Sequence, residues 1–285
     1  VEATCESPQT RLEWPKNGRF HTLPQEELAG WLRANGMAGL TLQPENRFLR
    51  ASHFASDGLH AYLLTNESIH DAVDAAAVFA PFSGGTYAVY DAMENRAVRC
   101  RAETAEIPIH LAPYESRVYL FGDLPEALPD EAEPFAAAKS VRLSAPWQLT
   151  LYRAEDYPNG QPETVMQLSA LENITAPKRF PRFGGVMQYE TSFVWDHPNA
   201  GRCRIDLGQV GETAEVWLNG HFTGVRLTPP YQFDFSGFLK TGENELKVVV
   251  ANTLGYEQRD EFSKYLLLDP SGLLGPVTLY AESAD

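Results

Sequence analysis

The chain has 285 residues, of which 44% are hydrophobic and 11% aromatic, and this composition is that of a folded protein long enough for two domains. The formal net charge of −15 disfavours nucleic acids and anionic membranes as partners, because both carry negative charge. No segment reaches the roughly 18 consecutive apolar residues that a membrane-spanning helix requires. We expect the chain to be an excised piece of a longer protein, because it begins with Val1 and shows no signal peptide.

Residues 1–36 form an N-terminal segment that is polar at first and then predicts one helix over about 24–35. Pro24 suits the first turn of a helix, and Gly36 is a residue that commonly follows the last turn. The apolar residues between them recur with spacings of three and four, which places them on one face of a helix. These residues are Leu28, Trp31 and Leu32.

Short strand-like segments replace the helical pattern over residues 37–122. They are separated by turn residues at fairly regular intervals, which is typical of a β-sandwich. The predicted strands are 60–66, 76–80, 86–91, 96–100, 107–111 and 116–121. The stretch 123–138 that follows is acidic and holds three prolines, so we interpret it as a stiff linker without a core.

The second domain is predicted over residues 139–285. Polar and apolar residues alternate in 215–218 and in 245–250, and this period of two indicates strands with two different faces. The first of these strands ends in Asn219-Gly220, which predicts a hairpin turn because both central positions of a type I′ turn need a positive φ. Large apolar side chains near residue 235 would supply a core, so the pattern predicts an antiparallel β-sandwich. These are Phe233, Phe235, Phe238 and Leu239.

Several sequence motifs of this second domain resemble those of the jelly-roll domain of family-2 glycoside hydrolases and of related galactose-binding-like domains. They stand in the same order and at similar spacing, over 216–220, 233–236, 242–246 and 271–279. The first domain resembles, more loosely, the accessory β-sandwich of α-L-rhamnosidase-like enzymes. The resemblance implies an all-β chain of two β-sandwich domains, the second a galactose-binding-like jelly roll, with one short N-terminal helix. It also implies a bacterial source and does not distinguish an exported protein from a cytoplasmic one.

Signatures of catalysis and of metal binding are absent from the sequence. It holds no nucleophile elbow, no phosphate-binding loop and no His-Glu-x-x-His motif. The seven histidines and the three cysteines, Cys5, Cys100 and Cys203, lack the spacing of metal ligands or of a disulfide framework. No oxygen-rich loop supports a structural calcium ion. We therefore expect no catalytic residue, metal or cofactor, and the resemblance implies that the catalytic barrel lies outside this chain.

Loops of the second domain are the candidates for carbohydrate contact, because the resemblance implies that sugars bind at one end of the sandwich. An aromatic ring can cover the apolar side of a sugar, and planar polar groups can bind its hydroxyls. The candidate residues, in the loops 195–199, 226–231 and 252–260, are Trp195, Asp196, Tyr231, Tyr256, Arg259 and Asp260. The alternative for each is a structural role, as a core ring or an ion pair. Trp217 is expected to be a packing residue, in the core or against another domain.

Family-2 enzymes send an Asn and an Asp from this domain into the neighbouring active site. Here the first of the two regions, 183–188, contains no Asn, and in the second, 265–270, Asp269 is displaced toward the following turn. These departures count against a direct part in a catalytic centre. Our leading hypothesis is a non-catalytic C-terminal portion of a glycoside hydrolase that packs against the catalytic domain of the parent chain and contacts carbohydrate. The alternative is a free-standing adhesion or interaction module of the same fold.

Overall fold

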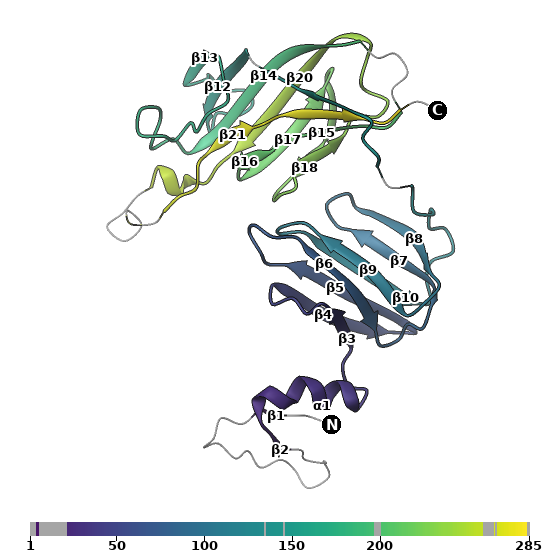
Figure 1. Ribbon diagram of the computed structural model, residues 1–285. Coiled ribbons are helices and arrows are strands. Elements are labelled where there is room, and N and C mark those ends of the chain that lie inside the picture. Colours follow the sequence, from purple (N-terminus) through teal and green to yellow (C-terminus); the bar gives the residue numbers. More distant parts are fainter. Residues whose placement is uncertain are drawn as a thin grey trace. The chain divides into compact units, whose positions relative to one another are not determined.

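The chain forms two compact units, Val1–Glu131 and Ala132–Asp285 (Figure 1). The computed structural model describes residues 4–5, 22–133, 135–144, 146–196, 201–258, 265 and 267–283. The division between the units falls inside the acidic, proline-containing stretch 123–138. The regular secondary structure of both units is mostly antiparallel strand, so the prediction of an all-β chain with two sandwiches and one short helix is confirmed.

The helix predicted over 24–35 is present as a 3₁₀ turn, η1 (Gln25–Glu27), that continues into α1 (Leu28–Ala34). Gly36, with a φ of 67°, follows its last turn. The apolar stripe of α1 is half-buried in the described structure. Ahead of the helix, β1 (Thr4–Cys5) pairs in parallel with β2 (Thr22–Leu23).

Unit 1 is a sandwich of a five-stranded sheet, in the order β4-β5-β10-β7-β8, and a three-stranded sheet, in the order β3-β6-β9. The six predicted strands are present, and β3 and β4 are two strands that the sequence pattern did not predict. The bounds are β3 Leu40–Gln43, β4 Leu49–Ser56, β5 Leu59–Asn66, β6 Val73–Phe79, β7 Gly85–Asp91, β8 Arg96–Ala102, β9 Glu106–Leu111 and β10 Ser116–Gly122.

Aromatic rings fill the core between the two sheets of unit 1. The ring of Phe79 lies 4.8 Å from that of Phe121 and 5.0 Å from that of Tyr62, measured between centroids. All three side chains are at most 1% exposed. Such offset and edge-to-face contacts stabilise a core beyond the area that the rings bury.

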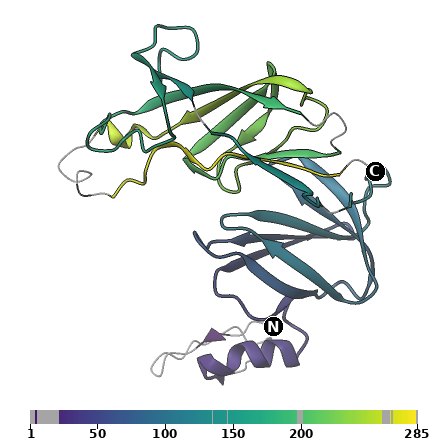
Figure 2. The ribbon, with the colours of Figure 1, turned by 45° about the horizontal axis from the view of Figure 1, so that its top comes forward.

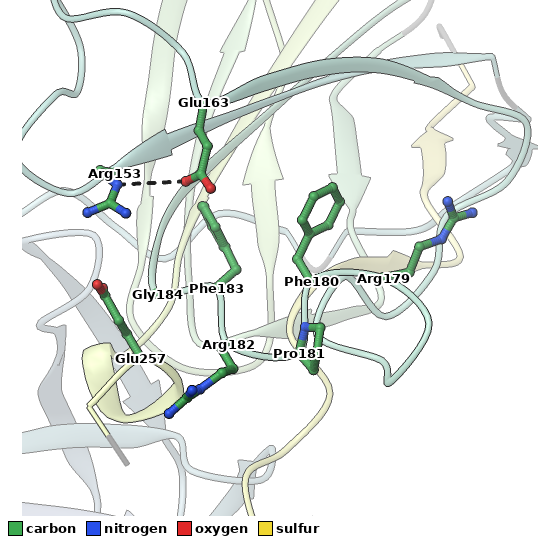
Figure 3. Close-up of a pocket in the computed structure, with 9 residues that line it drawn as sticks. All are labelled: Arg153, Glu163, Arg179, Phe180, Pro181, Arg182, Phe183, Gly184 and Glu257. Atoms are coloured by element: carbon green, nitrogen blue, oxygen red, sulfur yellow. Dashed lines mark ion pairs between the residues drawn. The ribbon is translucent and has the colours of Figure 1, made fainter. Parts of the chain in front are cut away.

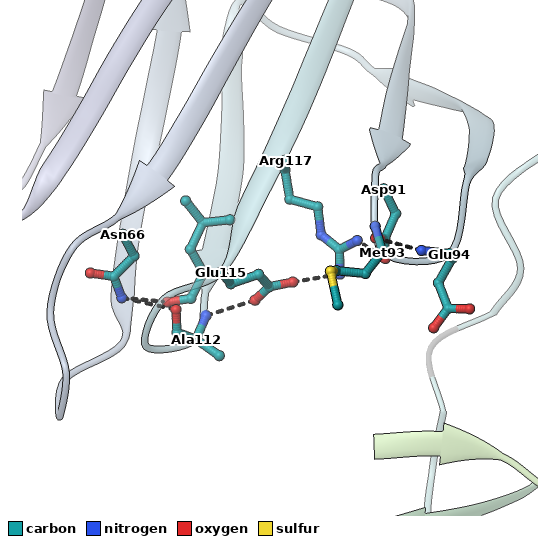
Figure 4. Close-up of polar contacts among 8 residues, drawn as sticks. Asn66, Asp91, Met93, Glu94, Ala112, Glu115 and Arg117 are labelled. Carbon is teal, nitrogen blue, oxygen red and sulfur yellow. Dashed lines mark hydrogen bonds and ion pairs between the residues drawn. The ribbon is translucent and has the colours of Figure 1, made fainter. Parts of the chain in front are cut away.

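The buried side chain of Asn66 ties the end of β5 to the connection between β9 and β10 (Figure 4). Its Nδ2 atom donates hydrogen bonds to the carbonyls of Asp71, Leu111 and Ala112 at 2.8, 3.1 and 3.0 Å. Glu115 extends this contact, because its carboxylate accepts from the Ala112 N–H at 2.7 Å. A single buried amide thus donates to three backbone carbonyls, of which that of Leu111 makes a buried contact and the other two make partly buried ones.

Unit 2 is a larger antiparallel sandwich. A six-stranded sheet, in the order β13-β12-β14-β20-β17-β18, faces a four-stranded sheet, in the order β11-β22-β15-β19, and β16 pairs with β21 beside them. The bounds are β11 Lys139–Arg142, β12 Trp147–Arg153, β13 Thr164–Leu168, β14 Gly185–Trp195, β15 Cys203–Asp206, β16 Gln209–Gly211, β17 Thr213–Leu218, β18 His221–Arg226, β19 Gln232–Asp234, β20 Gly242–Ala251, η2 Leu254–Tyr256, β21 Gly272–Gly275 and β22 Thr278–Ala281.

The predicted hairpin joins β17 to β18, and its central residues Asn219 and Gly220 both have a positive φ, of 51° and 80°. The side chain of Asn219 also contacts that of Asn244, from Nδ2 to Oδ1 at 2.9 Å, where β20 begins. Asn244 is fully buried and bonds the backbone of Lys240. Two of the motifs that carry the family resemblance, 216–220 and 242–246, are therefore in direct contact, and both form turns.

Trp217 is half-buried on the outer face of the six-stranded sheet, so it does not belong to the core, and packing against another domain stays a prediction. Its neighbours Val216 and Leu218 are the buried residues of β17, and alternation places Trp217 on the opposite face. The ring is covered from outside by Lys247, whose ammonium nitrogen lies 3.9 Å from the centroid. This cation–π contact lets a large aromatic side chain remain at the surface of the sheet.

We expect Asn66→Ala to lower the free energy of unfolding of unit 1 by about 3 kcal/mol, because it removes three hydrogen bonds to backbone carbonyls, each worth about 1 kcal/mol. Differential scanning calorimetry would show the transition of unit 1 at a lower temperature, with that of unit 2 unchanged. Asn35→Ala is the control, since its amide makes one bond at an exposed helix end. Equal effects of the two substitutions would contradict this account of Asn66.

Candidate functional site

One end of unit 2 carries a pocket of about 590 Å³ (Figure 3). Its lining comes from the end of β12, the residue Glu163 just before β13, the segment 179–184 that leads into β14, and Glu257 just beyond η2. Figure 2 shows η2 at one end of the unit 2 sandwich. The pocket is therefore built by loops at one end of the sandwich, on a rigid framework of strands.

Two glycines allow these loops to approach one another closely. A Cβ atom on Gly185 would lie 2.3 Å from the carbonyl oxygen of Tyr152, and one on Gly184 would lie 3.2 Å from the Cα atom of Leu254. The first distance is far shorter than any real carbon–oxygen contact. Gly185 is therefore required for the packing of β12 against the start of β14, and Gly184 lies in tight contact with the segment after β20.

The side chain of Asn252 joins three segments beside the pocket. Its Oδ1 atom accepts from the Gly185 N–H at 2.8 Å, and its Nδ2 atom donates to the Phe183 carbonyl and the Ser271 hydroxyl, both at 2.9 Å. The backbone N–H of Asn252 adds a bond to the Gly185 carbonyl at 3.1 Å. These contacts fix the loop before β14, the loop after β20 and the turn before β21 relative to one another.

Charged groups of both signs surround the pocket. Figure 3 shows Arg153 and Glu163 pointing toward each other, and the ion pair between them spans 4.0 Å. Arg179 reaches away to Glu172, which its guanidinium contacts at 2.6 Å. Arg182 is exposed and forms no ion pair with any residue that the structure describes. Its guanidinium is thus the basic group of the lining that remains open to a ligand.

The lining combines these charges with apolar surface. Phe180 is half-buried and Pro181 is exposed beside it, whereas Phe183 belongs to the core. Guanidinium and carboxylate groups are planar and can each hold two neighbouring hydroxyls, while a ring or a proline can contact the apolar side of a sugar. The arrangement is suited to a polar, hydroxyl-rich small molecule. Arg153, Glu163, Arg182 and Glu257 were not singled out by the sequence, since none lies in a recognisable motif.

The three loops proposed from the sequence do not share one end of the sandwich. In the pairing of β14 with β20, Val186 lies opposite Ala251 and Trp195 lies opposite Gly242. The ten steps of about 3.3 Å from Gly185 to Trp195 along β14 separate the loop after Trp195 from the pocket by about 33 Å. Because Arg226 pairs with Ala214 near the end of β20, the loop 226–231 lies at the pocket end, as does the loop after Ala251.

Three of the predicted sugar-contacting rings are buried. Trp195, Tyr231 and Tyr256 are 3%, 5% and 4% exposed. The hydroxyl of Tyr231 donates to the carbonyl of Glu212, and that of Tyr256 donates to the carbonyl of Asp269. Burial and these bonds favour the structural alternative for the rings. Asp196 is exposed, and Arg259 and Asp260 lie outside the described residues, so carbohydrate contact by these residues stays a prediction.

Among the described residues, no group of three or more His, Cys, Asp or Glu side chains could hold a metal ion. No helix in this part of the chain is long and apolar enough to cross a membrane. Two of the three cysteines, Cys100 and Cys203, are free and buried, and burial raises the pKa of both thiols. These thiols are accordingly unreactive packing groups.

Three known proteins place this geometry in context. A rhamnosidase from Novosphingobium sp. PP1Y matches with a TM-score of 0.68 and 22% identity, over 92% of this chain and 26% of its own. A putative beta-glucuronidase of Formosa agariphila is 34% identical over 87 residues, which are 30% of this chain and 7% of that protein. A beta-galactosidase of Pectobacterium atrosepticum is 26% identical over 132 residues, 44% of this chain and 12% of that protein. No family model matches the sequence.

This chain has the fold of one part of a rhamnosidase chain. The similarity extends over both units, whereas the two curated relatives match shorter stretches. All three proteins are glycoside hydrolases by name. The chain spans 7% and 12% of the length of the curated relatives, so it corresponds to a small portion of each.

We expect Gly185→Ala to destabilise unit 2 by about 2 kcal/mol, because the added methyl group must displace the backbone of Tyr152. Calorimetry or chemical denaturation would record the loss. Gly255→Ala, at the same end of the sandwich, is the matched control, since its Cβ atom would make only contacts of 3.4 Å and longer. A fully stable Gly185→Ala protein would show that the close approach is not required.

Proposed function

We propose that this chain is a non-catalytic portion of a glycoside hydrolase, which packs against the catalytic domain of that enzyme and binds carbohydrate. The observation that carries the proposal is the shared fold: 92% of the chain overlays on only 26% of the rhamnosidase chain. The arrangement of two sandwiches in series is thus matched within a much longer enzyme. Fold similarity alone does not assign a function, and the sequence matches to two further glycoside hydrolases support the same class.

The second sandwich is, in this proposal, a galactose-binding-like jelly roll. Its sheets of six and four antiparallel strands support this assignment. The contact between Asn219 and Asn244 also supports it, because it joins two of the sequence motifs that resemble this domain family. The three compared proteins are named for rhamnose, glucuronic acid and galactose. Because these sugars differ, the comparison supports carbohydrate as a class and favours none of them.

The pocket at the Gly185 end of unit 2 is the proposed carbohydrate site. Its volume of about 590 Å³ lies within the range of about 300–1,000 Å³ that is usual for small-molecule sites. The open guanidinium of Arg182 and the carboxylate of Glu257 offer donors and acceptors for hydroxyl groups, and Phe180 offers an apolar surface. Asn252 holds the loops that carry them, so the site is formed before a ligand arrives.

Absence of catalysis is tested directly with nitrophenyl α-L-rhamnoside, β-D-glucuronide and β-D-galactoside. We expect the purified chain to release no nitrophenol above the rate of buffer, since catalysis by most glycoside hydrolases requires two opposed carboxyl groups in an active site and the resemblance places that site elsewhere. Turnover that is lost in Glu163→Gln or Glu257→Gln would overturn the non-catalytic assignment and identify those carboxylates as its source.

Carbohydrate binding is tested by isothermal titration with the methyl glycosides of the same three sugars and by a glycan array. We expect at least one ligand to bind, and Arg182→Ala to weaken its affinity by roughly tenfold, the loss of about 1.4 kcal/mol that a charged hydrogen bond supplies. Arg142→Ala, on the distant strand β11, is the control and should leave the affinity unchanged. Unchanged affinity in Arg182→Ala would show that the ligand does not bind in this pocket. If no ligand binds at all, the proposal that this chain binds carbohydrate is wrong.

A further inference from the structure

One face of unit 1 presents apolar side chains to the outside of the five-stranded sheet. Along β5 and β10 the core residues Tyr62, Leu64, Tyr119 and Phe121 are buried, so the residues between them point away from the core. We call this set the outer face. It consists of Phe54, Leu59, Ala61, Leu63, Val118 and Leu120.

The register of the strands makes the outer face continuous. Ala61 lies between Phe54 of β4 and Leu120 of β10, and in the next row Leu63 lies between Ser52 and Val118. Phe54 is 66% exposed and Leu63 37% exposed. A sandwich sheet whose outer side faces water normally carries polar residues there, alternating with the apolar residues of the core. Contiguous apolar rows on that side indicate a surface that another protein region covers.

Strand β4 forms an unprotected edge beside this face. Seven of its eight residues are exposed, on both sides of the strand. Its outer edge pairs with no other strand in the part of the chain that the structure describes. Natural edge strands are usually blocked by Lys, Pro or a bulge. Here Arg50, at one end, is the strand's single charged residue, and the ladder with β5 runs without a register shift.

The opposite edge of the same sheet is bonded by the chain itself at one point, Arg99. The N–H of Arg99 in β8 donates to the carbonyl of Pro129 at 2.7 Å, and the N–H of Glu131 donates to the carbonyl of Arg99 at 2.8 Å. The guanidinium of Arg99 adds a bond to the carbonyl of Glu126 at 2.7 Å. Unit 1 thus bonds the backbone of one edge at Arg99 and leaves the other edge, next to the apolar face, open in the part of the chain that the structure describes.

We propose that the β4 edge and the outer face together form the surface on which the catalytic region of a glycoside hydrolase docks. This inference rests on the proposed function and identifies which surface of unit 1 takes part in the packing. The combination of apolar rows and open backbone groups fits a folded protein surface, which can supply both apolar contacts and a strand or loop backbone. A catalytic region is the favoured occupant because the overlay accounts for only 26% of the rhamnosidase chain, which leaves most of such an enzyme available to cover it.

Hydrogen exchange measured by mass spectrometry on this chain and on the complete polypeptide encoded by its gene tests the inference. We expect the amides of β4 to exchange at least tenfold more slowly in the complete polypeptide, because docking buries them. The amide of Arg99 in β8, already bonded to Pro129, is the internal control and should exchange at equal rates in both proteins. Unchanged exchange of β4 alongside a catalytic region would overturn this inference and leave the proposed function standing.

A substitution provides a second test of the inference. Phe54→Glu should leave the melting temperature of this chain unchanged, because the side chain is already exposed, and should abolish the added protection of β4 in the complete polypeptide. Val165→Glu is the matched control, since Val165 is a similarly exposed strand residue of unit 2 at 56%. Two further outcomes count against the inference. A gene that encodes no catalytic region overturns it together with the proposed function, and a dimer of this chain that sediments as such and dissociates in Phe54→Glu assigns the surface to a second copy.

Discussion

The amide of Asn252 is the contact on which the geometry of unit 2's pocket depends. It is bonded to the loop before β14, to the first residue of β14 and to the turn before β21, at distances of 2.8–2.9 Å. These segments come from residues 183, 185 and 271, which are far apart in the sequence. A partly buried amide with all these partners in place holds such segments in one arrangement, and each partner left unsatisfied would cost free energy. The charged residues of the pocket are therefore mounted on loops that have little freedom to move apart.

Asparagine plays the same part at two other places. Asn66 gathers three carbonyls at the end of β5, and Asn244 joins the start of β20 to the hairpin at Asn219. In each case a side chain that both donates and accepts replaces backbone bonds that strands cannot supply where they end. Between these points, the strands are held together by the apolar residues that alternate along them and face the core. The irregular segments that carry function are held by individual amides.

Much of the fold could be predicted from the sequence, because alternation, turn residues and the helical stripe are local signals. Strand β4 escaped prediction for a physical reason: both of its faces are exposed, so it has no apolar face for the pattern to reveal. The core was one of two places expected for Trp217, although its alternation with Val216 and Leu218 already put it on the other face of β17. The separation of Trp195 from the pocket depends on the direction and pairing of β14 and β20, which no local pattern encodes. The pocket residues Arg153 and Arg182 were missed because single arginines carry no signal until the loops that bear them are brought together.

The bonds of Asn66 and Asn173 also bear on two tripeptides that fit the acceptor pattern for N-linked glycans, Asn66-Glu67-Ser68 and Asn173-Ile174-Thr175. In both, the asparagine Oδ1 atom accepts from the backbone N–H two residues later, at 2.9 Å and 3.0 Å, so each tripeptide is an Asx turn. The spacing of two residues between the Asn and the Ser or Thr thus fits both an Asx turn and the acceptor pattern of the glycosylation enzyme. Since the Asn66 amide is fully buried, a eukaryotic secretory host could attach a glycan there only before unit 1 folds, and the glycan would then block the three carbonyl contacts. Production in a host without N-glycosylation avoids that competition.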